Sequence, residues 1–283
     1  MIKITFMGAG STVFLRNVLG DCIYTDALKG MEIALYDIDG QRLEQSAAIL
    51  EAINKGNGCP ASIRSYLGAE NRPKALSGAD FVINAIQVGG YDPCTITDFE
   101  IPKKYGLRQT IGDTLGIGGI MRALRTIPVL EDFARDMEAV CPNAWFLNYT
   151  NPMSMLTGYM LRYTGVKTLG LCHSVQTCSK TLMDAIGMSD RLEGRRELIA
   201  GINHMGWLLD IRDRDGNDLY PEIRRRAKEK NASEKHHDMV RFDYIEKLGY
   251  YCTESSEHNA EFMPYFIRKN HPELIEKYQI PLD

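Results

Sequence analysis

A cysteine and a histidine in the second half of the chain are the residues whose types could do the most chemistry together. Cys172 lies in the segment Leu171–Ser174, and His204 ends the segment Gly201–His204. A thiolate and an imidazole both bind divalent transition metals, and two such ligands leave positions open for substrate oxygens and water. Taken alone, each residue favours a structural role, a buried free cysteine and a histidine bonded to backbone. Their interpretation therefore depends on the elements that carry them.

Short apolar runs alternate with longer segments of helical spacing over the first 190 residues. The runs cover 2–7, 33–35, 81–86, 144–147 and 166–171. This alternation predicts βαβ units and a parallel sheet, with several strands buried on both faces. Cys172 and the polar segment Asn148–Pro152 each follow one of these strands. We therefore expect both at the carboxyl edge of the sheet, where ligands bind.

The first predicted strand leads into a glycine-rich turn that begins a helix. Gly8 permits the tight turn, and Gly10 lets a pyrophosphate approach the backbone beside Ser11 at the helix N-terminus. Val13 stands where the dinucleotide-binding motif has its third glycine. The next strand ends at Asp37, whose carboxylate is placed to bind a ribose diol and to repel a 2′-phosphate. Gly8, Gly10, Ser11 and Asp37 thus predict a site for NAD rather than NADP.

The pattern changes after Gly187. Two short apolar segments, 198–201 and 207–212, flank a polar hinge, and the segment Asp213–Asn217 predicts a hairpin turn before polar helical sequence. We therefore predict a Rossmann-like, doubly wound α/β domain that binds NAD over residues 1–190. Residues 191–283 are predicted to begin an α+β substrate and metal domain that is incomplete.

Charge and composition narrow the class of protein. The net charge of −4, without a long basic run, argues against a nucleic-acid partner. No apolar stretch approaches the length of a membrane span, and the first strand begins at once, which leaves no room for a signal peptide. The seven cysteines are scattered and form no Cys-x-x-Cys motif, which is typical of reduced thiols in a cytoplasmic protein.

Six motifs occur in order along the chain, and together they resemble glycoside hydrolase family 4. They are Met7–Ser11, Leu35–Asp39, Gly118–Pro128, Asn148–Pro152, Leu171–Ser174 and Gly201–His204. The later segment Thr253–Phe262 and the Cys-His-Ser sequence at 172–174 resemble the α-galactosidase (melibiase) branch. The resemblance implies an enzyme that needs NAD and a divalent metal, usually Mn²⁺, and that acts on small α-galactosides. It also implies self-association, and a carboxyl-terminal part that this chain lacks.

The resemblance further implies hydrolysis by oxidation and elimination, an exception to the two-carboxylate scheme of most glycosidases. NAD takes a hydride from C3 of the sugar, and the ketone makes the C2 proton acidic. A base removes that proton, the aglycone is eliminated, water adds, and the hydride returns. The metal polarises the sugar oxygens as a Lewis acid, and the cofactor carries the redox chemistry.

Site roles follow from the same resemblance. Cys172 and His204 are implied as the metal ligands, and Asn151 as a ligand of the sugar hydroxyls near C2 and C3. His173 matches the general acid toward the aglycone, and an imidazole suits proton donation at neutral pH. The C2 base is left open between two residues of the right region, which are Tyr251 and Glu257.

Other interpretations stay open at this point. A sister activity on glucosides, glucuronides or galacturonides differs by small changes of the sugar, and the sequence does not show which residue recognises C4. A lactate- or malate-type dehydrogenase shares the nucleotide turn, but it needs no thiolate metal site, so Cys172 and His204 argue against it. The chain could also be a truncated protein that binds NAD without hydrolysing a glycoside.

Overall fold

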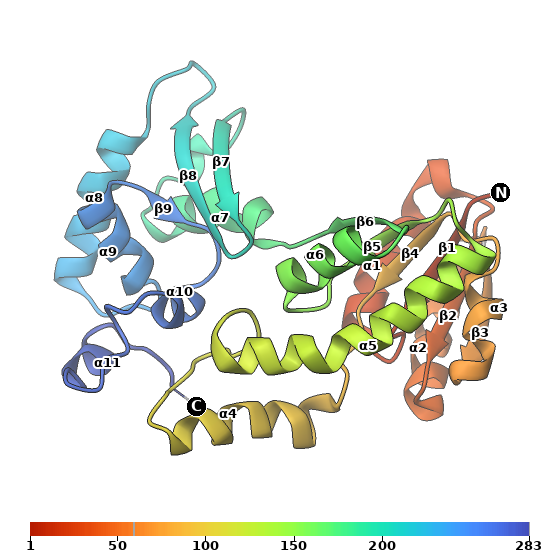
Figure 1. Cartoon of the computed structure of the whole chain (residues 1–283). Helices are drawn as coiled ribbons and strands as arrows, with labels where there is room; N and C mark the ends of the chain where they lie inside the picture. The colour runs from red at the N-terminus through yellow and green to blue at the C-terminus, as the bar shows by residue number, and fades with distance from the viewer. Residues whose placement is uncertain (59, 283) are drawn as a thin grey trace. The chain divides into compact units, whose positions relative to one another are not determined.

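The computed structural model of the chain describes residues 1–58 and 60–282, and Cys59 and Asp283 lie outside this description. Contacts between residues group the chain into two compact units (Figure 1). Unit 1 comprises Met1–Cys94 and Met121–Leu171, and unit 2 comprises Thr95–Ile120 and Cys172–Asp283.

Unit 1 holds a six-stranded parallel sheet with the strand order β3-β2-β1-β4-β5-β6. The strands are β1 (Lys3–Met7), β2 (Glu32–Asp37), β3 (Ser62–Leu67), β4 (Phe81–Asn84), β5 (Trp145–Asn148) and β6 (Lys167–Gly170). The order reverses at β1, which pairs with β2 on one side and β4 on the other. Such a switch point opens a crevice at the carboxyl ends of the strands, where nucleotides bind.

Helices cover both faces of this sheet. They are α1 (Thr12–Tyr24), α2 (Gly40–Gly56), α3 (Arg72–Leu76), α5 (Gly116–Val140) and α6 (Met153–Tyr163). One apolar cluster joins α1 and α2 to β1 and β2, and a second joins α3, α5 and α6 to the opposite face. Because β1 and β2 are buried on both faces, their apolar residues run consecutively along the strands. The predicted doubly wound α/β fold is confirmed.

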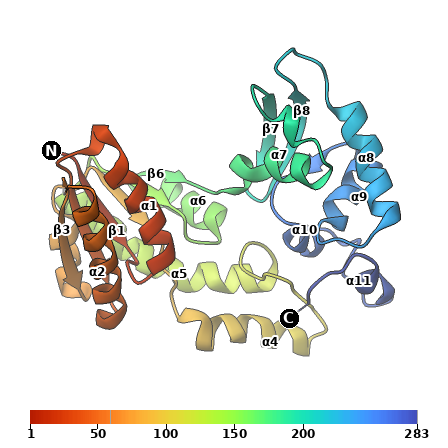
Figure 2. The ribbon, with the colours of Figure 1, turned by 180° about the vertical axis from the view of Figure 1, so that it is seen from behind.

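Unit 2 combines a three-stranded antiparallel sheet, in the order β7-β8-β9, with helices. The strands are β7 (Arg196–Ile202), β8 (Met205–Arg212) and β9 (Tyr251–Cys252). The helices are α4 (Ile96–Lys104), α7 (Ser174–Ala185), α8 (Tyr220–Ser233), α9 (Met239–Leu248), α10 (Ser256–Phe262) and α11 (Glu273–Lys277). Helices α8 and α9 lie side by side in both views (Figure 1, Figure 2).

Two turns follow strands of unit 2. Strands β7 and β8 are joined through Asn203 and His204. The turn predicted at Asp213–Asn217 lies after β8, where it brings Arg212 and Asp218 into an antiparallel bridge before α8. The Asp213 carboxylate accepts hydrogen bonds from the amides of Asp215 and Asn217, so this turn is held by its own side chain. The other turn, between β7 and β8, contains the candidate metal ligand His204.

The compact units are interleaved along the chain. Helix α7 belongs to unit 2 because its Cys178, Leu182 and Met183 pack with Leu208 and Ile211 of β8 in one apolar cluster. The functional division expected from the sequence, a nucleotide-binding domain over 1–190 and a substrate domain from 191, stays a prediction.

Across residues 1–58 and 60–282, no helix combines the length and apolar character needed to cross a membrane.

Candidate functional site

The turn after β1 in unit 1 is built around Gly8. Its φ is +87°, and a Cβ at this position would lie 2.7 Å from the Ala85 carbonyl oxygen. The amides of Gly8 and Ala9 both donate to the Tyr36 carbonyl oxygen at 3.0 Å, which ties the turn to β2. Only glycine meets both the backbone conformation and the close approach. The predicted reason for a glycine here is thus supported by the geometry of the turn.

Gly10 and Asp37 are in direct contact. The Gly10 amide donates to Asp37 Oδ2 at 2.6 Å, and a Cβ at residue 10 would lie 3.0 Å from that oxygen. The other carboxylate oxygen accepts from the amides of Ile38 and Asp39 at 2.8 and 2.9 Å. The missing side chain of Gly10 therefore allows the approach of Asp37, in addition to the predicted approach of a pyrophosphate.

The remaining nucleotide-turn residues lie at the start of α1. Ser11 occupies the N-cap position, and its side chain makes no capping hydrogen bond. Val13, which replaces the third glycine of the motif, is 65% exposed, so its side chain does not separate α1 from the sheet. The turn, the helix N-terminus and the acidic end of β2 together fit a dinucleotide.

Buried amides hold the loop after β5. Asn148 Oδ1 accepts hydrogen bonds from Asn84 Nδ2 at 2.9 Å and from the Thr150 amide at 3.1 Å. The next residue, Asn151, is half-buried, and its carbonyl oxygen accepts from Arg122 Nε at 3.2 Å. The candidate sugar-binding residue therefore follows a segment whose backbone is fixed by side chains.

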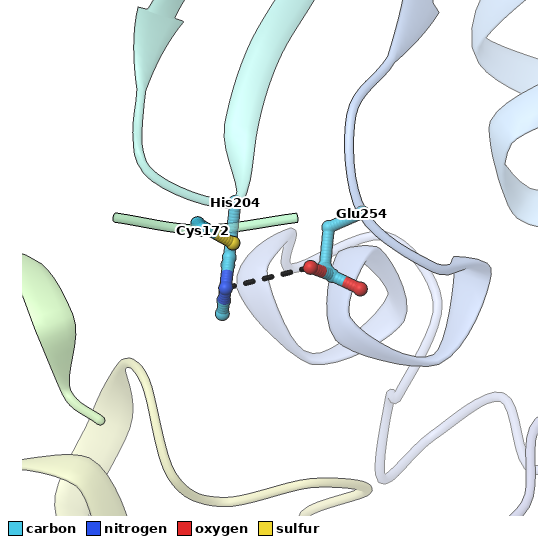
Figure 3. Close-up of side chains that lie close together, drawn as sticks. All are labelled: Cys172, His204 and Glu254. Carbon is cyan, nitrogen blue, oxygen red and sulfur yellow. Dashed lines mark ion pairs between the residues drawn. The ribbon is translucent and has the colours of Figure 1, made fainter. Parts of the chain in front are cut away.

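Three side chains of unit 2 bring ligand atoms together (Figure 3). Cys172 comes two residues after β6, His204 lies in the turn between β7 and β8, and Glu254 follows β9. One sulfur, nitrogen or oxygen atom of each lies within 4.8 Å of the other two. The Glu254 carboxylate faces the His204 ring, with 3.4 Å between Oε2 and Nε2 (Figure 3). The structure thus unites the two predicted ligands and adds a carboxylate.

Electrostatics favour a thiolate in this cluster. Burial raises the pKa of the Cys172 thiol, but hydrogen bonds with His204 and Ser174 outweigh it and lower the pKa to about 7. Burial lowers the pKa of His204, but its hydrogen bond with Cys172 and the negative charges of Cys172 and Glu254 raise it above the ordinary value. A thiolate is the form of cysteine that binds a metal.

A threonine fixes the ring of His204. Thr114 Oγ1 lies 2.9 Å from His204 Nδ1, and both residues are buried. This contact leaves Nε2 as the ring nitrogen that faces Glu254. A partner on the second ring nitrogen is typical of metal-binding histidines, because it sets the tautomer and the orientation of the ring.

A second histidine lies against the cluster. The ring of His258 is 4.9 Å from that of His204, and its Nδ1 lies 2.9 Å from Ser255 Oγ and 3.6 Å from Glu254 Oε1. Its Nε2 is 3.9 Å from Asp113 Oδ1. Burial lowers the pKa of His258, and the charge of Glu254 opposes that shift. The neutral imidazole is therefore favoured at this position.

The other residues predicted for catalysis, which are not among the candidate ligands, lie in different environments. His173 is exposed at the N-cap position of α7, beside Cys172 in sequence. Tyr251 is fully buried, and its hydroxyl donates to Asp238 Oδ2 at 2.6 Å, so a role as the C2 base does not fit its position. Glu257 is half-buried in α10 and stays a predicted base.

Sequence reasoning missed Glu254, Thr114 and His258. Glu254 and His258 lie within the Thr253–Phe262 motif, but that motif contains three glutamates, and nothing in their spacing singles out the first. Thr114 is 90 residues away from His204 in sequence, so only the fold reveals their contact. The structure itself offers one local signal for Glu254. Its backbone φ is positive, at 65°, and that of His204 is positive as well, at 62°.

Known proteins resemble this chain throughout its length. A model of the family 4 glycosyl hydrolases matches residues 3–188, and a model of the C-terminal domain of that family matches residues 199–282. An α-galactosidase of Bacillus subtilis is 64% identical over 283 residues, which are 100% of this chain and 64% of the relative. The chain therefore spans just under two thirds of the length of that enzyme.

Solved structures agree with these matches. The Bacillus subtilis protein lplD, described as a glucosidase, has a TM-score of 0.82 at 27% identity, over 100% of this chain and 67% of the other. A 6-phospho-α-glucosidase from gut microorganisms, solved with NAD and Mn²⁺, has a TM-score of 0.76 at 20% identity. That alignment covers 97% of this chain and 64% of the other.

Proposed function

Because the chain belongs to the family 4 glycosyl hydrolases, we propose that it acts in the hydrolysis of terminal α-galactosides, with NAD and Mn²⁺ as cofactors. The observation that carries the proposal is the cluster of Cys172, His204 and Glu254, whose ligand atoms lie within 4.8 Å of one another. The 64% identity to an α-galactosidase favours galactose among the sugars of the family. Cofactors named for a related 6-phospho-α-glucosidase favour NAD and Mn²⁺.

The residues present fit both cofactors. The turn around Gly8 and the carboxylate of Asp37 would hold the pyrophosphate and the adenosine ribose of NAD. Sulfur, imidazole and carboxylate donors would hold a divalent metal, and the carboxylate is the ligand type that suits Mn²⁺ best. NAD would supply reversible hydride transfer at C3 of the sugar, and the metal would supply Lewis acidity toward its hydroxyl oxygens.

The chain's own residues would orient the sugar and move protons. Asn151 would bind hydroxyls near C2 and C3, where its side-chain amide offers both a donor and an acceptor. His173 would donate a proton to the departing glycosidic oxygen, and Glu257 would remove the proton at C2. His204, held by Thr114, would present Nε2 to the metal without rotation of the ring.

The test is release of p-nitrophenol from p-nitrophenyl-α-galactoside, with NAD, Mn²⁺ and a reducing agent omitted in turn. We expect turnover only with all three, and none in the variant Cys172→Ser. Turnover without NAD would contradict the oxidation–elimination mechanism. The α-glucoside, α-glucuronide and α-galacturonide assayed in parallel identify a sister activity if one of them is the better substrate.

Binding measurements separate a wrong substrate from a missing activity. Calorimetry with NAD and with Mn²⁺ reports on the two cofactor sites without any sugar. Binding of both without turnover on the panel would favour the alternative of an NAD-binding protein that does not hydrolyse glycosides. Self-association and a cytoplasmic location stay predictions, which light scattering and cell fractionation test.

A further inference from the structure

Helix α10 lies directly after the loop that carries Glu254, and two of its side chains bind the backbone of segments that reach the metal cluster. We propose that α10 positions the metal site through these side chains, Asn259 and Glu261. Neither contributes an atom to the cluster of ligands, so both would act through other residues. The inference rests on the proposed metal site.

Asn259 holds the loop on both sides of Glu254. Its side chain is fully buried, and Nδ2 donates to the carbonyl oxygens of Thr253 at 3.1 Å and Ser255 at 3.0 Å. Between these two peptides, Glu254 has a φ of +65°, which a residue with a side chain seldom adopts. A single amide group therefore holds the strained conformation that directs the Glu254 carboxylate toward His204.

The same loop is tied to the strand that follows His204. The Thr253 amide donates to the Gly206 carbonyl oxygen at 2.7 Å, and the Gly206 amide donates to Thr253 Oγ1 at 3.0 Å. Gly206 lies two residues after His204, and Thr253 lies one residue before Glu254. The positions of the two ligands are thus connected through one backbone hydrogen bond and one hydrogen bond to a side chain, and Asn259 fixes the backbone conformation at Glu254.

Glu261 holds a different segment. Its carboxylate accepts hydrogen bonds from three consecutive amides, those of Thr110 at 2.7 Å, Ile111 at 3.3 Å and Gly112 at 3.1 Å. Thr110 Oγ1 also donates to the Glu257 carbonyl oxygen at 2.8 Å, one turn earlier in α10. Two residues after Gly112 the segment reaches Thr114, whose hydroxyl contacts His204 Nδ1.

Asn259 and Glu261 affect different members of the candidate metal site. Asn259 acts on Glu254, a candidate ligand, and Glu261 acts on Thr114, the partner of a candidate ligand. Residues that orient metal ligands in this way change metal affinity by about 10- to 100-fold when they are replaced. A residue that merely stabilises the fold would change melting temperature without changing the affinity of the folded protein.

The experiment measures the Mn²⁺ dissociation constant of the chain by calorimetry and by electron paramagnetic resonance. We expect Asn259→Ala and Glu261→Ala to weaken binding by about 10- to 100-fold, and Glu261→Gln, which keeps one acceptor oxygen, to weaken it less. Tyr244→Phe is the matched control, because it removes a buried hydrogen bond to the Asn259 carbonyl oxygen and leaves both contacts intact. It is expected to lower the melting temperature without changing the affinity.

Double variants show whether each residue acts through its stated partner. In a Glu254→Ala background, Asn259→Ala should weaken Mn²⁺ binding by less than about twofold further, and Glu261→Ala should do the same in a Thr114→Val background. Full additive effects in these backgrounds would overturn the inference. If an alanine variant fails to fold, Asn259→Ser and Glu261→Gln give the same comparison, with a weakening of more than about threefold expected.

The outcomes also distinguish this inference from the proposed function. If Cys172→Ser and His204→Ala abolish Mn²⁺ binding while Asn259→Ala and Glu261→Ala leave it unchanged, the metal site is right and the positioning role is wrong. If Cys172→Ser and His204→Ala leave Mn²⁺ binding unchanged, the proposed metal site itself fails, and the positioning role fails with it.

Discussion

His204 and Glu254 face each other across 3.4 Å, and both have a backbone conformation that is rare outside glycine. Their φ values are 62° and 65°, and they lie 50 residues apart in a β-turn and in a loop. Strained residues of this kind persist where surrounding structure holds them, and they concentrate at functional sites. The conformation of this pair, together with the contact between the two side chains, therefore supports the candidate site.

Removing the hydroxyl of Thr114 should weaken metal binding. Thr114→Val keeps the shape of the side chain but loses the contact with His204 Nδ1, so the ring is no longer fixed in one tautomer. We expect the Mn²⁺ affinity, measured by calorimetry, to fall by about tenfold. Thr114→Ser keeps the hydroxyl and should stay close to the wild type. Equal affinities for valine and wild type would contradict the role of this contact.

Cys172 should react with iodoacetamide at a lower pH than the buried cysteines. Its pKa of about 7 makes half of the thiol a thiolate near neutrality, whereas burial raises the pKa of Cys141 to about 11 and that of Cys178 to about 12. The alkylation rate at Cys172, followed by mass spectrometry, should rise with pH and level off above about 8. His204→Asn should move this rise to higher pH. A midpoint near that of a free thiol would contradict the prediction, and Mn²⁺ should protect the residue.

Much of unit 1 could be predicted from the sequence because its signals are local. Strands buried on both faces read as consecutive apolar residues, and the turn at Gly8 lies directly between a strand and a helix. The strand β3 was missed, since Ser62–Leu67 forms an edge of the sheet and carries polar, mostly exposed residues. Strand β3 lacks the apolar run on which the prediction depended, whereas β6 at the other edge lies within the run 166–171.

The candidate site could be predicted only in part. Cys172 and His204 were identified because their residue types are typical metal ligands. Glu254, Thr114 and Asn259 belong to common residue types, and their roles arise from contacts that join distant segments. Tyr251, one of the two candidates for the C2 base, does not fit that role for a related reason: its hydroxyl has a buried partner in Asp238, which only the fold reveals.

Adding a methyl group at Gly8 should disrupt the nucleotide turn. In Gly8→Ala the new Cβ meets the Ala85 backbone at 2.7 Å, and φ is +87°. Gly30→Ala is the matched control, because its φ of +83° gives similar strain but no atom of residues 1–58 and 60–282 lies within 4 Å of its Cβ. We expect Gly30→Ala to lower the free energy of unfolding by about 1 kcal/mol and Gly8→Ala by about 3 kcal/mol. Calorimetry should also show lost NAD binding in Gly8→Ala alone.

Asp238→Asn should strongly destabilise unit 2. The Asp238 carboxylate is buried, bonded to Arg241 Nε at 2.5 Å and to Ser256 Oγ at 2.8 Å, and Arg241 is only 5% exposed. Loss of the charge leaves a buried guanidinium unpaired, which costs about 3–5 kcal/mol in urea denaturation. The control Glu229→Gln breaks an exposed pair with Arg225 and should change the unfolding midpoint little. Similar shifts in both variants would contradict the importance of burial.

Replacing Asp37 should change both the affinity for NAD and the choice of cofactor. The carboxylate holds the amides of Gly10, Ile38 and Asp39, and its free electron pairs are the predicted partners of the ribose diol. We expect Asp37→Ala to weaken NAD binding by at least about tenfold, because a charge-assisted hydrogen bond contributes about 1.5–3 kcal/mol. The affinity for NADP should fall less than that for NAD, since the repulsion of the 2′-phosphate disappears together with the carboxylate.

The matched control for this change is Asp39→Ala, two residues further along the same turn. Asp39 caps helix α2 by accepting a hydrogen bond from the Arg42 amide at 3.1 Å, so its loss should lower stability by about 1 kcal/mol. Its carboxylate has no predicted contact with the cofactor, and NAD affinity measured by calorimetry should stay near that of the wild type. If both variants lose NAD affinity equally, Asp37 acts by stabilising the turn. If Asp37→Ala alone loses it, and NADP binding is spared, the carboxylate acts on the ribose.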